Sequence, residues 1–363
     1  MNIDVVFMQE QGQKAGQAVK TAKALADFLL AAKRSIHIAA YHFALKDPQL
    51  VKPVQDALKD RSDAGVEIRI AYYFEHKFSP QEHGAGTLPT GTEAFLGTIT
   101  EGTDIEIRPI RGTHLMHNKY AVRDGHTGNA AVWTGSTNFT DGAWKLMENN
   151  VVIVDSPDVC AFYENDFGEL WATEEVSGTG TGVLDSGSAT VNGAKIDVAF
   201  SPGKGKFIDH VISDQIGSAR SRIKISSMVI SSGTILGALV DAIAHDQVPQ
   251  DAFGGIYDGS EMDMVIKDWQ KSPHSATKAD LFKEVAQKLV RKPSRHFNPN
   301  KPDADYDFMH NKVVVCDNVV VTGSFNFSNN AAMNAENLLV IHSKDWADKY
   351  AKYIDGLVKA YGR

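Results

Sequence analysis

The sequence predicts an α/β protein made of two duplicated halves, and three observations lead to this fold class. A signature with His, Lys and Asp at 117, 119 and 124 returns 193 positions later at 310, 312 and 317. The strand-like string Ile-Asp-Val-Val-Phe at 3–7 returns at the same offset as Ile-Asp-Val-Ala-Phe at 196–200. Strand-like and helical patterns alternate along both halves, which is typical of an α/β sheet rich in parallel strands.

The individual elements follow from the spacing of apolar residues and from capping residues. Asp47 stands at the N-cap position of one predicted helix and Pro48 in its first turn. In the first half we expect strand 3–7, a helix with Val19, Ala22, Ala26 and Leu29 on its apolar face, strand 35–43, helix 48–59, strand 66–73 and a closing helix at 157–171. In the second half we expect strand 196–200, a helix with Ile208, Val211, Ile212 and Ile216 on its apolar face, strand 222–230 and a closing helix at 344–357.

The predicted domain boundaries are 1–175 for the first half, 176–194 for a linker and 195–363 for the second half. The linker is rich in Gly, Ser and Thr, so we expect it to be flexible. Its string Gly-Thr-Gly-Thr-Gly at 178–182 lacks the preceding strand and following helix of a nucleotide-binding loop. A long loop is expected at 75–100, either as a lid over the site or as a plain surface excursion.

The composition is that of a folded protein, with 43% hydrophobic and 23% charged residues among 363. The N-terminus has no basic and then apolar signal segment, and no apolar run reaches membrane-spanning length. Cys160 and Cys316 lack the spacing of metal ligands or of a disulfide framework. We therefore expect free thiols, no transmembrane segment and a cytoplasmic protein.

The charge pattern gives two opposing indications about nucleic acid. The net charge of −8 disfavours loose electrostatic binding to a polyanion. The segment 283–301, however, carries six basic residues against the single acid Glu284. This segment is either a solvated helix face followed by a loop or a phosphate-attracting rim ahead of the second signature. The basic residues are Lys283, Lys288, Arg291, Lys292, Arg295 and Lys301.

The two signatures supply the candidate residues for one shared site. The catalytic candidates are His117, Lys119, Asp124 and Glu148 from the first copy and His310, Lys312, Asp317 and Glu336 from the second. The candidate phosphate-binding residues are Ser136, Asn138, Ser324 and Asn326. The Glu-Asn pairs at 148–149 and 336–337 are aligned here at an offset of 188. Most single His-x-Lys strings are surface pairs, but two copies in register with the same downstream partners indicate function.

These residue types suit phosphoryl transfer. In a strand, residues two apart share a face, so the His and Lys of each copy can address one substrate. One neutral imidazole can attack phosphorus while the other, protonated, gives its proton to the leaving oxygen. Two lysines can neutralise the phosphate oxygens, and Glu148 and Glu336 are candidates to accept a hydrogen bond from a histidine. No metal or other cofactor is then required.

A metal site built on His114 and His117 is the competing interpretation. A spacing of three places two histidines on one face of a helix, whereas this segment has the pattern of a strand. The phosphoryl-transfer interpretation is therefore preferred.

The paired His-x-Lys-x4-Asp strings, each followed by Gly-Ser-x-Asn and Glu, resemble the phospholipase D superfamily over both halves of the chain. The resemblance implies two α/β halves related by a pseudo-two-fold axis, with the active site at their interface. It also implies a metal-independent mechanism through a covalent phosphohistidine. In two-copy members the nucleophile usually comes from the first motif, which here would be His117, leaving His310 as general acid. Asp124 and Asp317 would orient and support the site.

The resemblance leaves two substrate classes open. The strings Gly-Ser-Phe-Asn-Phe-Ser at 323–328 and Ala-Glu-Asn at 335–337 resemble the small bacterial endonucleases of the superfamily. The predicted loop at 75–100 is not notably apolar, as an entrance for acyl chains would be. We therefore expect a nuclease acting on DNA or RNA, with a phospholipase D acting on phospholipid head groups as the alternative. Two signatures in one chain make a monomer sufficient for a complete site.

Overall fold

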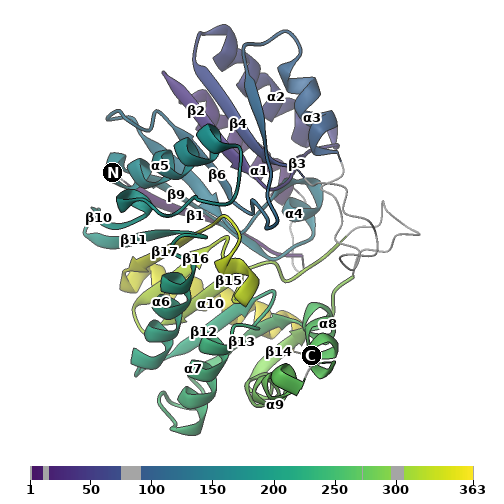
Figure 1. Cartoon of the computed structure of the whole chain (residues 1–363), viewed down its shortest axis with the longest axis vertical. Helices are drawn as coiled ribbons and strands as arrows, with labels where there is room; N and C mark the ends of the chain where they lie inside the picture. Colours follow the sequence, from purple (N-terminus) through teal and green to yellow (C-terminus); the bar gives the residue numbers. More distant parts are fainter. Residues whose placement is uncertain (1, 11–15, 75–90, 272, 296–305, 363) are drawn as a thin grey trace.

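The computed structural model describes residues 2–10, 16–74, 91–271, 273–295 and 306–362, and in this part of the chain each half is built on one large β-sheet (Figure 1). The first half contains β1 (Asn2–Met8), α1 (Gln17–Leu30), β2 (Ser35–Ala40), β3 (Phe43–Ala44), α2 (Pro48–Asp63), β4 (Glu67–Tyr73), α3 (Thr92–Thr100), β5 (Glu106–Ile110), β6 (Lys119–Arg123), β7 (Ala131–Gly135), β8 (Phe139–Thr140), α4 (Asp141–Lys145), β9 (Asn149–Asp155) and α5 (Pro157–Thr173). The second half contains η1 (Val183–Asp185), β10 (Ser186–Val191), β11 (Ala194–Ser201), α6 (Gly205–Ser218), β12 (Ile223–Ser227), α7 (Gly233–Ala244), β13 (Phe253–Asp258), α8 (Gly259–Gln270), α9 (Pro273–Ala286), β14 (Leu289–Lys292), β15 (Lys312–Cys316), β16 (Val319–Gly323), η2 (Asn329–Ala332), β17 (Glu336–His342) and α10 (Lys344–Tyr361).

The two sheets repeat one topology, which confirms the predicted duplicated α/β fold. The strand order is β1-β9-β7-β6-β2-β4-β5 in the first sheet and β10-β11-β17-β16-β15-β12-β13-β14 in the second. Among the described strands of these two large sheets, only β2, β4 and β5, and likewise β12, β13 and β14, pair in parallel. The expectation of parallel-rich sheets is therefore wrong, because the signature strands follow one another through short turns and so pair antiparallel.

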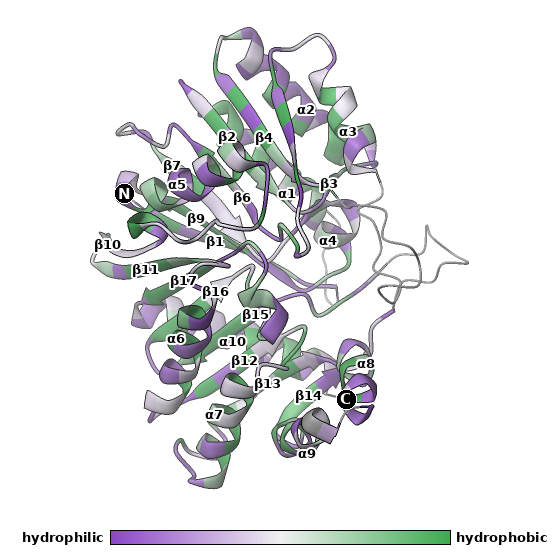
Figure 2. Cartoon of the chain, viewed as in Figure 1, coloured by the Kyte–Doolittle hydropathy of each residue, from purple (hydrophilic) through white to green (hydrophobic). Residues whose placement is uncertain are grey.

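Most of the hydrophobic core of the described residues lies in three regions. One joins the halves, where α5 and α10 pack between the two sheets, with Val122, Tyr163, Val313 and Tyr350 among its buried side chains. The outer faces are covered by α1 and α2 in the first half and by α6 to α9 in the second. In Figure 2 the outer helices carry hydrophilic residues along their solvent side. The shared core places the two signatures at a fixed relative position.

Several connections differ from the sequence-based expectation. The predicted flexible linker contains η1 and the edge strand β10, which is ordered because its alternating small and β-branched residues pair with β11. Residues 92–100 of the predicted loop form α3, while 75–90, with His76 and His83, lie outside the described residues. Asp47 caps α2 as predicted, accepting from the Gln49 N–H at 2.9 Å.

Cys160 and Cys316 are buried free thiols. Among the described residues, no helix is both long and apolar enough to span a membrane.

Candidate active site

The two signatures meet where the halves touch. Each histidine lies two residues before the first strand of its signature, β6 or β15. The backbone N–H of His117 donates to the Ala335 carbonyl at 2.8 Å, and that of His310 donates to the Glu148 carbonyl at 3.0 Å. Parallel backbone bridges between Met116 and Ala335 and between Met309 and Glu148 complete the pattern. The segments therefore exchange partners across the interface in the same way, which gives the pseudo-two-fold arrangement.

This exchange also fixes the structural register of the repeat. Ala335 corresponds to Glu148, because each is bridged to the methionine of the opposite motif. Phe7 pairs with Asn150 in β9, and Phe200 pairs with Asn337 in β17. The partner of Glu336 in the first half is therefore Asn149, so the predicted alignment of Glu148 with Glu336 is wrong by one residue. Successive side chains of a strand point to opposite faces, so this slip sends Glu148 away from the histidines.

His117 is held by a carboxylate of the other half. Its Nδ1 lies 2.7 Å from Glu336 Oε2, as expected from the sequence, and Asn334 Nδ2 donates to the second oxygen of Glu336 at 3.2 Å. Asn334 also accepts the Leu115 N–H through Oδ1 at 3.0 Å. This amide, which the sequence reasoning missed, connects the carboxylate to the chain segment that carries His117.

His310 is held by an amide in the equivalent place. Its Nδ1 lies 3.0 Å from Asn149 Oδ1, which also accepts from the Ser136 hydroxyl at 2.9 Å. An amide oxygen can only accept, so Nδ1 carries a proton and Nε2 is left to exchange one. The two histidines thus have the same placement but different partners.

The two lysines converge on the histidines. Each ammonium donates to the carbonyl of the histidine two residues earlier, Lys119 to His117 and Lys312 to His310. Lys119 Nζ also lies 4.9 Å from the centroid of the Tyr41 ring. An ammonium group has three donors, so these contacts leave capacity for phosphate oxygens.

Burial controls the protonation of this cationic cluster. Burial lowers the pKa of both His117 and His310 well below the usual value, and the nearby Lys119 and Lys312 lower it further. Burial also lowers the pKa of Lys119 well below its usual value and that of Lys312 to about 7. It raises the pKa of Glu336 to about 8, although both lysines oppose the change. A bound phosphate anion would offset the repulsion among these cations.

The Gly-Ser-x-Asn strings line the interface with polar groups. A Cβ on Gly135 would lie 2.3 Å from the Asn150 carbonyl oxygen, and one on Gly323 equally close to that of Asn337, so only glycine fits. The Ser136 and Ser324 hydroxyls accept the backbone N–H of Asn150 and Asn337, both at 3.0 Å. Both serine hydroxyls therefore already hold the backbone of the fold.

Asn138 and Asn326 behave differently from these serines. The side-chain oxygen of each is buried and has no hydrogen-bond partner among the described residues. Such unpaired buried atoms are rare in folded proteins. If the side-chain amide rotated by half a turn, its NH2 group would take the place of the oxygen. The NH2 group could then donate a hydrogen bond to a phosphate oxygen.

Asp124 and Asp317 support the strands rather than the histidines. Asp124 accepts the backbone N–H of Lys33, Arg34 and Ser35 at 2.6–3.1 Å. Asp317 accepts those of Arg220, Ser221 and Arg222 at 2.7–3.1 Å in the same way. Each carboxylate thereby fixes the start of the strand that pairs with its signature strand.

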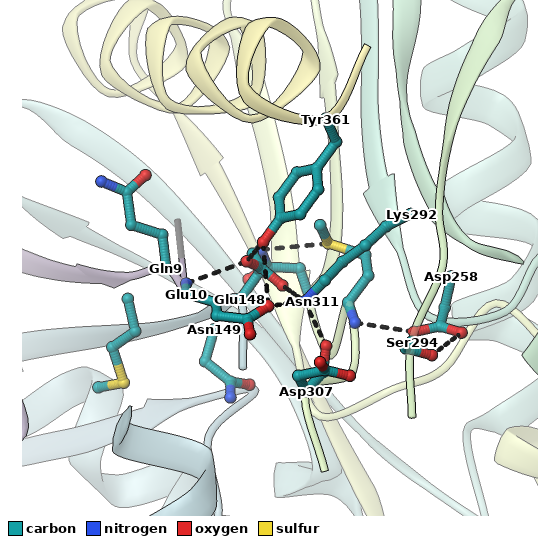
Figure 3. A network of polar contacts seen from close by, with 12 residues as sticks. Gln9, Glu10, Glu148, Asn149, Asp258, Lys292, Ser294, Asp307, Asn311 and Tyr361 are labelled. Atoms are coloured by element: carbon teal, nitrogen blue, oxygen red, sulfur yellow. Dashed lines mark hydrogen bonds and ion pairs between the residues drawn. The ribbon is translucent and has the colours of Figure 1, made fainter. Parts of the chain in front are cut away.

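Glu148 takes part in a separate buried cluster beside the second motif (Figure 3). Its carboxylate accepts from Lys292 and from the Tyr361 hydroxyl, and it accepts the Glu10 N–H at 3.1 Å. The prediction that Glu148 bonds a histidine is therefore wrong. Burial raises the pKa of Glu148, and Lys292 opposes this rise.

Three of the described basic residues at 283–301 are paired with carboxylates, whereas Lys283 and Lys288 are exposed. Lys292 is 1% exposed and paired with Glu148. Arg291 is paired with Asp263 at 2.5 Å, and Arg295 with Asp307 at 2.8 Å. Lys301 lies outside the described residues. Sequence reasoning counted these cations correctly but could not see the carboxylates that other elements bring to them.

His114 lies apart from the His117–Glu336 pair. It lines a cavity of about 650 Å³ together with Arg111, Thr113, Val176 and Met333. No group of three or more His, Cys, Asp or Glu side chains in the described ranges is placed to hold a metal ion.

The fold and the site define a class of proteins in which two α/β halves each contribute a His-Lys pair to one centre. A family model described as "Cardiolipin synthase, PLD-like domain" matches residues 25–171 and again 212–358. The chain therefore belongs to the phospholipase D superfamily of phosphodiesterases.

Individual relatives are more distant. A mitochondrial cardiolipin hydrolase from Xenopus laevis is 26% identical over 143 residues, which cover 39% of this chain and 57% of that protein. The phosphatidylserine synthase of Haemophilus influenzae has a TM-score of 0.63 at 13% identity, covering 99% of this chain and 88% of the other. The polyphosphate kinase of Porphyromonas gingivalis has a TM-score of 0.57 at 10% identity, covering 98% and 50%. The two structures show that the fold is shared.

Proposed function

We propose that the protein hydrolyses phosphodiesters through a covalent intermediate on His117, and that its substrates are DNA or RNA. The observation that carries the reaction is the meeting of two buried histidines and two buried lysines across the interface of the halves. Unlike a metal site, this centre would supply both the nucleophile and the positive charge from side chains.

In the first step, His117 Nε2 forms a bond to phosphorus while the bond from phosphorus to the leaving oxygen breaks. That oxygen takes the proton from His310 Nε2. In the second step, the neutral His310 Nε2 takes a proton from water, the hydroxyl oxygen bonds to phosphorus, and the P–N bond breaks. The products are a phosphomonoester and an alcohol, and both histidines return to their starting state.

The unequal partners of the histidines support this division of roles. Phosphorylation at Nε2 makes the His117 ring cationic, and the Glu336 carboxylate beside Nδ1 can compensate that charge. Because burial raises the pKa of Glu336 to about 8, its negative charge is costly until such a cation forms. The interaction is then stronger in the intermediate than in the free site, as catalysis requires. His310 lies next to an amide, and no described carboxylate pairs with its ring to retain the proton.

The preference for nucleic acid comes from the endonuclease-like strings at 323–328 and 335–337 and from the cavity lined by the segment that precedes the first motif. Arg111 and His114 line this cavity. These side chains can bind a further phosphate, which a polynucleotide always offers next to the one being cleaved. The alternative is a phospholipid substrate, which the names of the cardiolipin and phosphatidylserine relatives favour.

The test is cleavage of labelled single- and double-stranded DNA and RNA in excess EDTA, with short-chain phosphatidylcholine and cardiolipin in parallel. We expect nucleic-acid cleavage that persists in EDTA and disappears in His117→Ala and in His310→Ala. Release of lipid head groups with intact nucleic acid would show that the substrate is a phospholipid and would leave the proposed mechanism in place. Near-wild-type turnover in either histidine variant would refute the two-histidine scheme.

A further inference from the structure

Lys292 is a buried cation for which the proposed chemistry has no use. It ends β14, is 1% exposed, and its ammonium donates to both the Glu148 carboxylate and the Asp307 carbonyl. Figure 3 shows these groups around the Lys292 side chain, with the Tyr361 hydroxyl also directed at Glu148. One ammonium thus joins β14 to the two chain segments that meet at the second motif.

The segment 307–310 is held at every residue. The Asp307 carbonyl accepts from Lys292, and the Phe308 carbonyl accepts the Glu148 N–H at 3.2 Å. The Met309 N–H donates to Asp258 Oδ2 at 2.9 Å. The His310 N–H donates to the Glu148 carbonyl at 3.0 Å. Lys292 and Glu148 therefore provide three of these four connections.

Glu148 also determines the position of the amide that orients His310. Its neighbour in sequence is Asn149, whose Oδ1 lies 3.0 Å from His310 Nδ1. Fixing Glu148 by side chain and backbone therefore fixes both the backbone of His310 and the acceptor for its ring. The described residues around the first motif include no such cation: Ala335 stands in the place of Glu148, and Asn334 connects Glu336 to Leu115.

The cluster depends on the charge of Lys292. Removing one member of a buried ion pair leaves the other uncompensated, which is far more costly than losing a surface pair. Without Lys292, the Glu148 carboxylate would retain only the Tyr361 hydroxyl and the Glu10 N–H among its described contacts. The Glu148 carboxylate would then take up a proton, or Glu148 and the 307–310 segment would shift.

We propose that Lys292 is a positioning residue for His310: its ammonium fixes Glu148 and the 307–310 backbone so that His310 can deliver its proton to the leaving oxygen. This inference rests on the proposed function, in which His310 is the general acid. Lys292 is therefore expected to affect the protonation of the leaving oxygen and not the attack by His117.

The experiment compares two phosphodiesters that transfer the same phosphoryl group to the enzyme and differ only in the leaving group. One has a 4-nitrophenolate leaving group, which departs without a proton, and the other has an alkoxide leaving group, which requires one. Formation of the covalent enzyme is followed by rapid quench in wild type, His310→Ala and Lys292→Met. The matched control is Lys224→Met, which removes a cation of the same half that pairs with Asp355 at 3.1 Å.

We expect Lys292→Met to slow covalent-enzyme formation from the alkoxide ester about tenfold or more and from the nitrophenyl ester less than about twofold. Lys224→Met should affect both esters equally and little. Equal losses on both esters in Lys292→Met, or no loss on either, would overturn the proposal. If Lys292→Met does not fold, Glu148→Gln, which keeps the shape and removes the charge, takes its place and should show the same difference between esters.

The controls separate this inference from the proposed function. If wild type forms no covalent enzyme, or if His310→Ala slows both esters equally, the proposed function fails and the role of Lys292 with it. If His310→Ala discriminates between the esters and Lys292→Met does not, only the role of Lys292 is refuted.

Discussion

The two signature regions have nearly the same backbone arrangement and different side-chain support. Around His117 the support is a carboxylate, Glu336, held by the neutral amide of Asn334. Around His310 the order is reversed: the ring contacts a neutral amide, Asn149, and the charged pair of Glu148 and Lys292 lies behind it. Duplication therefore preserved the placement of the histidines while one-residue differences gave each ring its own electrostatic environment.

In the proposed mechanism, this difference lets two similar motifs perform opposite proton chemistry. A carboxylate beside Nδ1 favours a ring that becomes cationic, as a nucleophile does on phosphorylation. An amide fixes the tautomer without adding a charge, so the ring can give up its proton. The variants below alter this difference, from the largest expected effect to the smallest.

Glu336→Gln removes the carboxylate from His117 and makes the two regions alike. We expect kcat/KM to fall about a hundredfold, the upper range for loss of a hydrogen-bonded partner that orients and tunes a reacting group. The matched change Asn334→Ala leaves the carboxylate in place and should cost less. Steady-state kinetics on one substrate checks both, and equal activity of Glu336→Gln and wild type would contradict the role of the carboxylate.

Asp124→Ala and Asp317→Ala test the supporting residues that the two regions share. We expect Asp124→Ala to lower the free energy of unfolding by about 2 kcal/mol, because several backbone N–H donors lose a charged acceptor. Asp317 is less buried, so the same change there should cost less. Urea unfolding measures the stability of each variant, and an assay at one substrate concentration measures its activity. A loss of activity without a loss of stability would indicate a chemical role for the aspartate.

The same carboxylates give a defined pH dependence of stability. Burial acts to raise the pKa of Asp124, but hydrogen bonds from Asn129 and from the 33–35 backbone outweigh it and the pKa is lowered. A folded-state pKa below the unfolded value means that the stabilisation is complete above about pH 4. It is lost as the pH falls through the folded-state pKa. The stability difference between wild type and Asp124→Ala should therefore shrink on acidification.

Asn149→Asp introduces the missing carboxylate at His310. A negative charge beside Nδ1 raises the pKa of the ring, which makes it a weaker acid. We expect the alkaline limb of the kcat/KM profile to move upward, because the pKa that sets it is raised, and kcat/KM on the plateau below that limb to fall about tenfold. An unchanged profile would show that the partner of His310 does not set its acidity.

How much the sequence could predict depended on the range of the interactions. The duplication, the paired His and Lys residues and the capping by Asp47 were predictable because each is a local string or a short spacing. The position of Glu148 was not, because one extra residue lies between Ser136 and Asn150 compared with Ser324 and Asn337, in the stretch that forms α4. The identical Glu-Asn strings concealed this shift.

A signal for the correct register was nevertheless present. The serines that precede the closing helices, Ser156 and Ser343, are 187 positions apart, which aligns Asn149 with Glu336. The pairing of Lys292 with Glu148 had no comparable signal, because the two residues are 144 positions apart and only the folded chain brings them together. The buried cation was therefore indistinguishable from its exposed neighbours.

The measurement that tests the central claim most directly is the location of the phosphoryl group on the trapped enzyme. Wild type and His310→Ala would be mixed with a nitrophenyl phosphodiester, quenched in alkali, where phosphohistidine survives, and digested for peptide mass spectrometry. The different support of the two rings predicts a phosphoryl adduct on His117 in both proteins. An adduct on His310 in wild type would contradict the assignment of the carboxylate-paired histidine as nucleophile.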